Sequence, residues 1–256
     1  MNGMTRTVAS IESPHSPEII RVVEALLADS PPDATLLTML HELAASAVRN
    51  EEKALLLARD WANLGRYQAD NDARIAVAER PDLVMMGNSI TEIWPAADPS
   101  FFVPGRVGRG IAGQTSPQTL LRFQADVIAL RPRAVHLLCG TNDIAGNTGP
   151  TTPYRFQCNV QAMTSLAKAA GIQVYLASIL PVTHFLWQPD VDARPWVSEL
   201  NAWQRDWASA QGLTYVDYHS AMVDEHGGMR AEFSRDGAHP NRRGYAAMRQ
   251  ILEPLI

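Results

Sequence analysis

The sequence contains few of the features that mark secreted, membrane-spanning or nucleic-acid-binding proteins. Only two cysteines, Cys139 and Cys158, occur in 256 residues. This excludes a disulfide framework, and we expect both to be small buried hydrophobes of a reduced protein. No stretch approaches about 20 consecutive apolar residues, so no transmembrane helix is expected. The net charge is −5 without a run of Lys or Arg. Nucleic acid is therefore not expected as a partner, because binding to phosphates depends on clustered cations.

Two further absences concern location and metals. Residues 1–8 contain one Arg with no apolar run behind it, so no secretory signal is visible. We therefore expect a cytoplasmic protein, and secretion only if the N-terminus is truncated. His219 and His226 show neither H-x-H nor H-E-x-x-H spacing. No metal site is predicted from them, and no cofactor is required.

The composition is that of a globular chain, with 46% hydrophobic and 19% charged residues. Its length suits one large domain, or one domain with an extension. Residues 1–80 have apolar residues at helical spacing, and Ser16-Pro17-Glu18 is typical of a helix start. We predict a helical N-terminal extension over 1–80 and a catalytic domain over 81–256. The extension is expected to pack on that domain or to mediate a homodimer.

From residue 81 onward, short apolar runs alternate with amphipathic helical stretches. The runs lie at 83–86, 106–111, 134–139, 174–179 and 213–216, and the helical stretches lie near 116–130, 154–170, 196–210 and 241–253. This alternation predicts βαβ units, and hence an α/β fold in which helices cover both faces of a five-stranded parallel sheet as a three-layer sandwich. Ligands of such folds bind beyond the carboxyl ends of the strands.

Small and polar residues follow three of the predicted strands. Ser89 stands in a loop that opens with Gly87, Asn142 follows Gly140, and Gly113 offers an unhindered backbone N–H. Each feature alone is more often a turn or a helix cap. Residues 108–113 also match G-x-G-x-x-G, but the flanking pattern lacks the helix start and the acidic residue of a dinucleotide site, so we take this match as accidental.

A fourth polar cluster precedes the last predicted helix. It contains Asp236 and, three residues later, His239. The helix N-terminus favours a neutral imidazole there, which is the form that a general base requires. Asp236 can fold back to accept a hydrogen bond from Nδ1–H of that ring, which would fix its tautomer. Asp217 also ends a strand and is the second candidate for this acid.

Taken together, these motifs resemble the SGNH hydrolases, also called the GDSL esterase/lipase family. The resemblance covers about residues 82–256 and rests on four motifs in the family's order: Gly87-Asn88-Ser89-Ile90, Gly113 with its neighbours, Gly140-Thr141-Asn142-Asp143, and Asp236-Gly237-Ala238-His239-Pro240. It implies a flavodoxin-like sandwich. It further implies a Ser89 nucleophile, a His239 base oriented by Asp236, and an oxyanion hole of the Ser89 N–H, the Gly113 N–H and the Asn142 side chain. Asn88 departs from the Asp that is usual in the family.

The resemblance is greatest to a branch with carbohydrate acetylesterases and lysophospholipase-like proteins. It implies a serine esterase for short acyl groups, acetyl first, on a small acylated substrate such as a carbohydrate. His184 and Trp187 are candidates for lining the substrate site, with a plain surface loop as the alternative. A lysophospholipase- or thioesterase-like acyl hydrolase is the alternative function. A non-catalytic nucleotide- or sugar-binding module is the alternative of another class.

Overall fold

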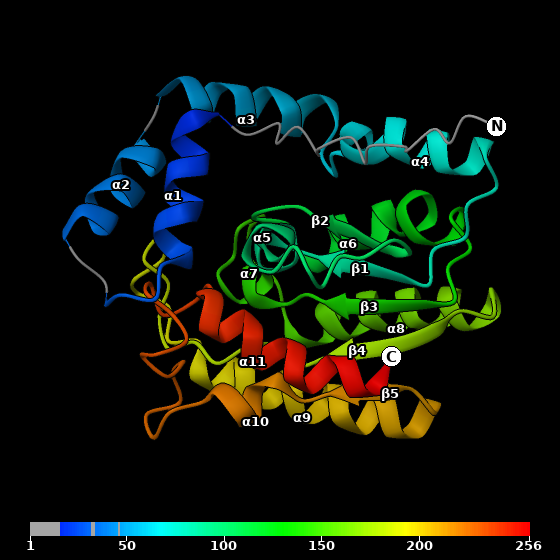
Figure 1. The fold of residues 1–256 in the computed structure, drawn as a ribbon. Coiled ribbons are helices and arrows are strands. Elements are labelled where there is room, and N and C mark those ends of the chain that lie inside the picture. Colours follow the sequence, from blue (N-terminus) through cyan, green and yellow to red (C-terminus); the bar gives the residue numbers. More distant parts are fainter. Residues whose placement is uncertain (1–15, 32–33, 46) are drawn as a thin grey trace.

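A five-stranded, all-parallel sheet lies at the centre of the molecule (Figure 1). The computed structural model describes residues 16–31, 34–45 and 47–256. The strand order is β2-β1-β3-β4-β5. The strands span β1 Leu83–Gly87, β2 Arg106–Gly110, β3 Ala134–Leu138, β4 Gln173–Ala177 and β5 Thr214–Val216. Every strand overlaps one of the apolar runs predicted from the sequence. The predicted fold class is therefore confirmed.

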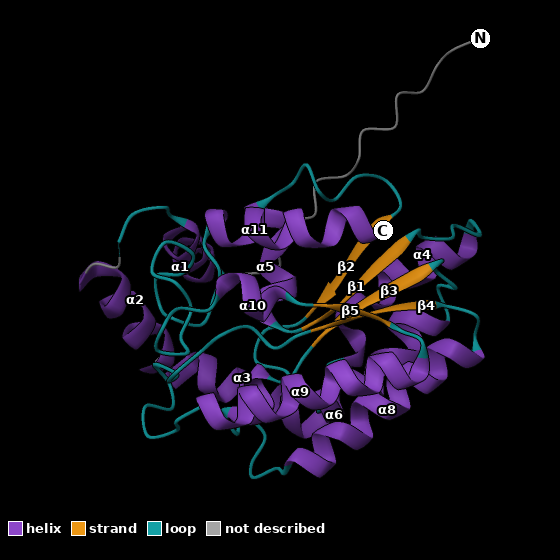
Figure 2. Ribbon diagram, turned by 90° about the horizontal axis from the view of Figure 1, so that it is seen from below, coloured by secondary structure: helices purple, strands orange, loops and turns teal. Residues whose placement is uncertain are grey.

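Helices cover both faces of the sheet (Figure 2). Alternate strand residues point to opposite faces, so Val84 and Met86 pack in one core and Leu83 and Met85 in the other. The first core is closed by α6 Ser116–Phe123, η2 Gln124–Ile128, α8 Pro153–Ala169 and α9 Arg194–Gln211. The second core is closed by α5 Ser89–Ala97, α10 Tyr218–Met222 and α11 Arg242–Leu252. The short elements α7 Thr141–Ile144 and η3 Glu253–Leu255 complete this part of the chain.

The predicted N-terminal helices precede the first strand. They are α1 Pro17–Leu27, α2 Ala34–Ala45, α3 Ala47–Arg59, η1 Leu64–Tyr67 and α4 Gln68–Ala76. Ser16 caps α1 as its sequence predicts, and Leu27 at the end of α1 packs into the core beneath α11. Residues 1–15 of the expected extension lie outside the described residues. The division of the chain at residue 80 stays a prediction.

The structure shows how deeply His136 and the two cysteines are buried. His136 is fully buried on β3 with Nε2 2.9 Å from the Tyr218 hydroxyl, and burial lowers its pKa to about 3. Cys139 is buried, but Cys158 is only half-buried, so its predicted burial is wrong. The reason is helical geometry, since Phe156 and Val160 face the core and Cys158 lies midway between them on the other side of α8. Within the described residues, no helix has the length and apolarity needed to cross a bilayer.

Candidate active site

Ser89 lies where β1 turns into α5. The last residue of β1 is Gly87, and a Cβ there would lie 2.3 Å from the Thr91 hydroxyl and 2.5 Å from the Leu138 carbonyl oxygen, so only glycine fits. Asn88 caps α5, because its Oδ1 accepts a hydrogen bond from the Ile90 N–H at 3.0 Å. An aspartate at this position would accept the same bond. Ser89 thus stands in the first turn of α5, with 9% of its surface exposed.

The three side chains of the predicted catalytic triad form one continuous series of hydrogen bonds, although Ser89 lies far from the other two in sequence. The Ser89 Oγ lies 2.9 Å from His239 Nε2, and His239 Nδ1 lies 2.7 Å from Asp236 Oδ2. The other carboxylate oxygen, Oδ1, accepts bonds from the Ala238 and His239 N–H groups at 2.9 and 2.7 Å. With Nδ1–H donating to the carboxylate, the Nε2 lone pair faces the serine hydroxyl.

The electrostatics of this pair favour the charged forms of both groups. Burial alone would raise the pKa of Asp236, but the His239 ring and the backbone N–H groups hold it below its ordinary value. Burial alone would lower the pKa of His239, but attraction to Asp236 and their hydrogen bond raise it above its ordinary value. An imidazolium formed by taking a proton from Ser89 would therefore be stabilised in place.

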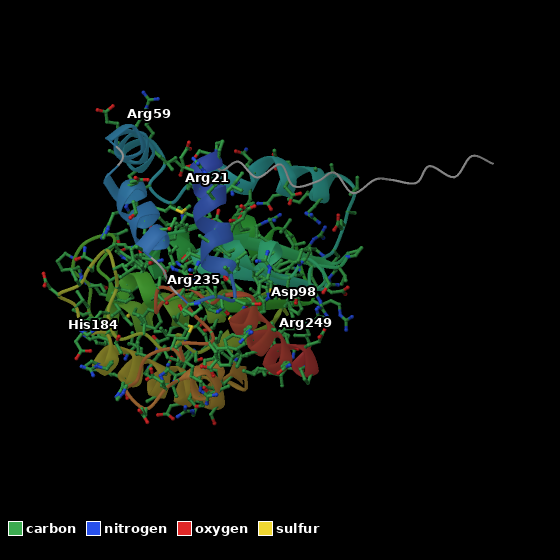
Figure 3. All side chains as sticks on the ribbon, turned by 60° about the vertical axis from the view of Figure 1, so that its left-hand side comes forward. Arg21, Arg59, Asp98, His184, Arg235 and Arg249 are labelled. Carbon is green, nitrogen blue, oxygen red and sulfur yellow. The ribbon has the colours of Figure 1, made fainter. Side chains whose placement is uncertain are left out.

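The loop that carries Asp236 and His239 is held at both sides. The Ser234 hydroxyl donates to the His239 carbonyl oxygen at 2.7 Å, which closes the loop on itself. Arg235 extends away from the site and donates to the carbonyl oxygens of Ala25 and Pro31 at 2.6 and 2.7 Å. Figure 3 shows Arg235 next to the end of α1. The C-terminal end of α1 therefore supports the loop that holds the acid and the base.

The predicted oxyanion residues Gly113 and Asn142 lie on two neighbouring segments, called the oxyanion loops. The first is residues 111–115 between β2 and α6, and the second is residues 139–152 between β3 and α8, which includes α7. Gly113 has a φ of +76°, in the left-handed region that favours glycine. The loop before it is held by Glu92, which accepts from the Ala112 N–H at 2.7 Å. Asn142 is 3% exposed in α7, and its Nδ2 donates to the Gln114 carbonyl oxygen at 2.9 Å. The two loops are thus bonded directly to each other.

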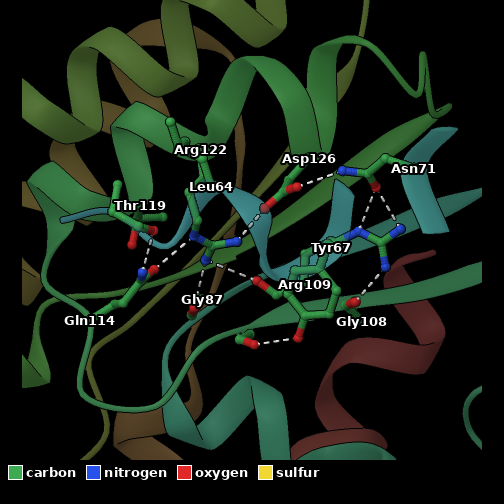
Figure 4. Close-up of polar contacts among 12 residues, drawn as sticks. Leu64, Tyr67, Asn71, Gly87, Gly108, Arg109, Gln114, Thr119, Arg122 and Asp126 are labelled. Atoms are coloured by element: carbon green, nitrogen blue, oxygen red, sulfur yellow. Dashed lines mark hydrogen bonds and ion pairs between the residues drawn. The ribbon is translucent and has the colours of Figure 1, made fainter. Parts of the chain in front are cut away.

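A buried polar network supports the loop that contains Gly113 and Gln114 (Figure 4). Arg122 is fully buried, pairs with Asp126, and donates to the Gln114 side chain at 2.7 Å and to the Arg109 carbonyl oxygen at 3.1 Å. Burial lowers the pKa of Arg122, and Asp126 opposes this shift. Asp126 also accepts from Asn71 of α4 at 2.7 Å.

The N-terminal helices contribute further bonds to the same loop. The Gln114 side chain donates to the Ala62 carbonyl oxygen at 2.7 Å, and the Tyr67 hydroxyl donates to that of Gly110 at 2.5 Å. Sequence reasoning did not find this network. Its one local signal was the i, i+4 spacing of Arg122 and Asp126 in a predicted helix.

Among the predicted substrate-lining residues, the structure brings Trp187 but not His184 to the site. The Trp187 ring lies 5.9 Å from the His239 ring, centre to centre. His184 is exposed to solvent. Asp217, the second candidate for the acid, caps α10 through the Ser220 N–H at 3.0 Å and lies 3.6 Å from Arg205 instead.

A cavity of about 350 Å³ adjoins the oxyanion loops. Its polar residues lie in the oxyanion loops or on α8. Trp61 of the N-terminal segment contributes an aromatic ring. It is lined by Trp61, Thr115, Pro117, Asp143, Thr148, Gly149, Pro150, Thr151, Arg155, Cys158 and Asn159. Burial raises the pKa of Asp143 to about 6, although Ser116 donates two hydrogen bonds to it. No group of three or more His, Cys, Asp or Glu in the described part of the chain could hold a metal ion.

Comparison with known proteins identifies the family. The profile of the GDSL-like lipase/acylhydrolase family matches residues 85–247. A protein classed as an acylhydrolase from Bacteroides fragilis is 41% identical, with a TM-score of 0.72, over 77% of this chain and 96% of its own. A GDSL-like lipase from Bacteroides thetaiotaomicron is 39% identical, with the same TM-score, over 77% of this chain and 98% of its own.

A more distant neighbour is similar in fold alone. An acetyl xylan esterase is 20% identical, with a TM-score of 0.56, over 68% of this chain and 99% of its own. A search of curated proteins found no match. The chain belongs to the GDSL-like lipase/acylhydrolase family, a family of carboxylic ester hydrolases.

Proposed function

We propose that this acylhydrolase is a serine esterase in which Ser89 attacks the ester, His239 is the general base and Asp236 orients the ring. The observation that carries the proposal is the continuous chain of bonds, 2.9 Å from Ser89 Oγ to His239 Nε2 and 2.7 Å from Nδ1 to Asp236. A serine hydroxyl is a weak nucleophile on its own, and an adjacent neutral imidazole is the group that activates it.

The reaction proceeds in two halves. His239 Nε2 takes the Ser89 proton as Oγ forms a bond to the carbonyl carbon, and the negative oxygen is held by the N–H groups of Ser89 and Gly113 and by Asn142 Nδ2. The Ser89 N–H belongs to the first turn of α5, where backbone N–H groups have no acceptor within the helix. The C–O bond to the alcohol then breaks as His239 returns the proton to the leaving oxygen. Water repeats these steps on the acyl-enzyme and releases the acid.

We propose a short acyl group, acetyl first, on a carbohydrate alcohol. The adjoining cavity supports a polyhydroxylated alcohol, because Thr148, Asn159 and Arg155 offer hydrogen-bonding groups and Trp61 offers a ring face. The fold neighbour described as an acetyl xylan esterase acts on an ester of this kind, as its name states.

The decisive experiment for the chemistry is the Ser89→Ala variant. We expect its kcat on p-nitrophenyl acetate to fall by about 10⁴-fold or more, and labelling by a fluorophosphonate probe to be lost. Hydrolysis at the parental rate would refute the assignment. Calorimetric titration with NAD is the matched test of the nucleotide-binding alternative, and we expect no heat of binding.

The substrate is tested separately from the chemistry. In a series of p-nitrophenyl esters from C2 to C12 we expect the highest kcat/KM at C2, and a maximum beyond C8 would contradict the acetyl preference. Acetate release from acetylated sugars is expected from the parent and not from Ser89→Ala. Trp61→Ala should raise KM for the preferred acetylated sugar and leave p-nitrophenyl acetate unaffected.

We also propose that the N-terminal helices mediate a homodimer. Their exposed apolar side chains support this, and they include Leu37, Leu55 and Leu56. Sedimentation of the parent should give twice the mass of the chain, and charged substitutions at Leu55 and Leu56 should give the monomer. A monomeric parent at micromolar concentration would contradict the proposal.

A further inference from the structure

A chain of side-chain hydrogen bonds links the loop after β4 to the oxyanion loops. The Trp187 indole Nε1–H donates to Asn147 Oδ1 at 3.1 Å. Asn147 Nδ2 donates to Asn142 Oδ1 at 3.0 Å and to the Gly113 carbonyl oxygen at 3.2 Å. Asn142 Nδ2 donates in turn to the Gln114 carbonyl oxygen at 2.9 Å. We propose that Asn147, held by Trp187, is a positioning residue that sets the oxyanion hole of the proposed esterase.

The groups at the two ends of this series of hydrogen bonds determine which atom donates and which accepts in each bond. An indole N–H can only donate, and a backbone carbonyl oxygen can only accept. Trp187 therefore turns the oxygen of the Asn147 amide toward itself, and the Asn147 NH₂ toward Asn142. Gln114 draws the Asn142 NH₂ in the same sense. Both amides have one orientation in which every bond is made, and a flip of either would face oxygen against oxygen.

The hydrogens on the two amide nitrogens can be counted to show which of them is left for the substrate. Asn147 Nδ2 has two hydrogens, and its bonds to Gly113 and Asn142 use both. Asn142 Nδ2 also has two, and Gln114 uses one. The second remains for the oxyanion of the substrate. A flipped Asn142 would present its Oδ1 to that negative oxygen and would oppose the transition state.

Asn147 acts on the backbone donor as well. Gly113 is in the left-handed region, and its N–H is the proposed second donor of the oxyanion hole. The bond from Asn147 to the Gly113 carbonyl oxygen restrains that loop in addition to the bond from the Ala112 N–H to Glu92. One amide thereby fixes the relative positions of the Gly113 loop and Asn142.

Trp187 connects the same network to the base. Its ring lies 5.9 Å from the ring of His239, with the two planes inclined by 40°. The side chain is 37% exposed, so this end of the network lies at the surface of the site. Trp187 is therefore the part that can be changed with the least disturbance of the core.

The test is a double-mutant cycle of Asn147→Ala and Asn142→Ala on p-nitrophenyl acetate. Asn147→Ala alone should lower kcat by roughly tenfold to a hundredfold and leave KM within about threefold, because only transition-state binding is lost. In the Asn142→Ala background the same substitution should lower kcat by a smaller factor, because only the restraint on Gly113 is then lost. Asn147→Asp, which has the same shape but no N–H groups, should lower kcat at least as much as Asn147→Ala.

Trp187→Phe keeps a ring beside His239 and removes the indole N–H, and we expect a twofold to tenfold loss of kcat. Trp207→Phe is the matched control, because the Trp207 indole also donates at 3.1 Å, to the Thr164 hydroxyl between α8 and α9. It should leave kcat unchanged.

The possible failures are distinguishable. Parental kcat in Asn147→Asp, or a KM increase with unchanged kcat, would overturn the positioning role. Equal losses in both backgrounds of the cycle would overturn it too, since no part of the effect of Asn147 would then pass through Asn142. If Asn147 variants unfold, equal kcat in Trp187→Phe and Trp207→Phe would count against the proposal. Parental activity of Ser89→Ala would refute the proposed function instead.

Discussion

The two halves of the candidate site are built in different ways. The acid–base half is local, because Asp236 and His239 are three residues apart and their loop closes through Ser234. The oxyanion half is assembled from the loops after β1, β2 and β3 and is supported by Arg122 and by the segment around Asn71. A change in the local half should therefore lower the catalytic rate. A change in the residues that support the oxyanion half should lower the free energy of unfolding as well.

The sharpest test of the local half is Asp236→Asn. An amide in place of the carboxylate stabilises the wrong His239 tautomer, so kcat should fall by about 10⁴-fold. The carboxylate raises the pKa of His239, and the ring is active only when neutral. The acidic limb of kcat/KM should thus lie above pH 6.5 in the parent and move to lower pH in the variant. A limb that does not move would contradict the pairing.

Arg122→Ala tests the buried support of the oxyanion half. Removing one partner of a buried ion pair leaves Asp126 short of its main charge partner, and we expect a loss of about 3–5 kcal/mol in the free energy of unfolding. Urea denaturation measures it. Arg194→Ala is the control, because the ion pair of Arg194 with Asp192 is exposed and should contribute little to the free energy of unfolding. Equal losses would show that the network is not the support proposed here.

Asn142→Ala tests the chemistry of the oxyanion half and leaves the buried network of Arg122 in place. Loss of one donor should raise the barrier by roughly 3–4 kcal/mol, which lowers kcat by about 10²–10³-fold at nearly constant KM. Steady-state kinetics on p-nitrophenyl acetate measure both constants. A change in KM alone would mean that Asn142 contacts the ground state and not the transition state.

The smallest effect is expected where α1 supports the local half. Arg235→Ala removes two hydrogen bonds to the carbonyl oxygens of Ala25 and Pro31, which should destabilise α1 by about 1–3 kcal/mol. Hydrogen exchange of α1 should quicken, while kcat falls less than tenfold. Arg243→Ala, whose side chain is 62% exposed and 4.0 Å from Asp29, should change neither. A loss of kcat as large as that of Asp236→Asn would show that this half is not local.

Much of the fold could be predicted because it depends on periodicity. The alternation of apolar runs and amphipathic helices predicted the parallel sheet, and every strand was found near its predicted place. The burial of Cys158 was mispredicted because an apolar stretch does not show which side of a helix faces the core. His184 and Trp187 were equivalent in the sequence, and only the path of their loop brought one of them to His239.

The sequence by itself determined the family, the fold class and the residues Ser89, Asp236, His239, Gly113 and Asn142 as candidates, because short motifs and strand ends are local patterns. Only the tertiary structure decided how the oxyanion loops are held, through Arg122, Asn71 and Asn147. The physical reason is that a buried polar group must find its partner wherever the folded chain provides one. Asn71 and Asp126 are 55 residues apart in sequence and 2.7 Å apart in space.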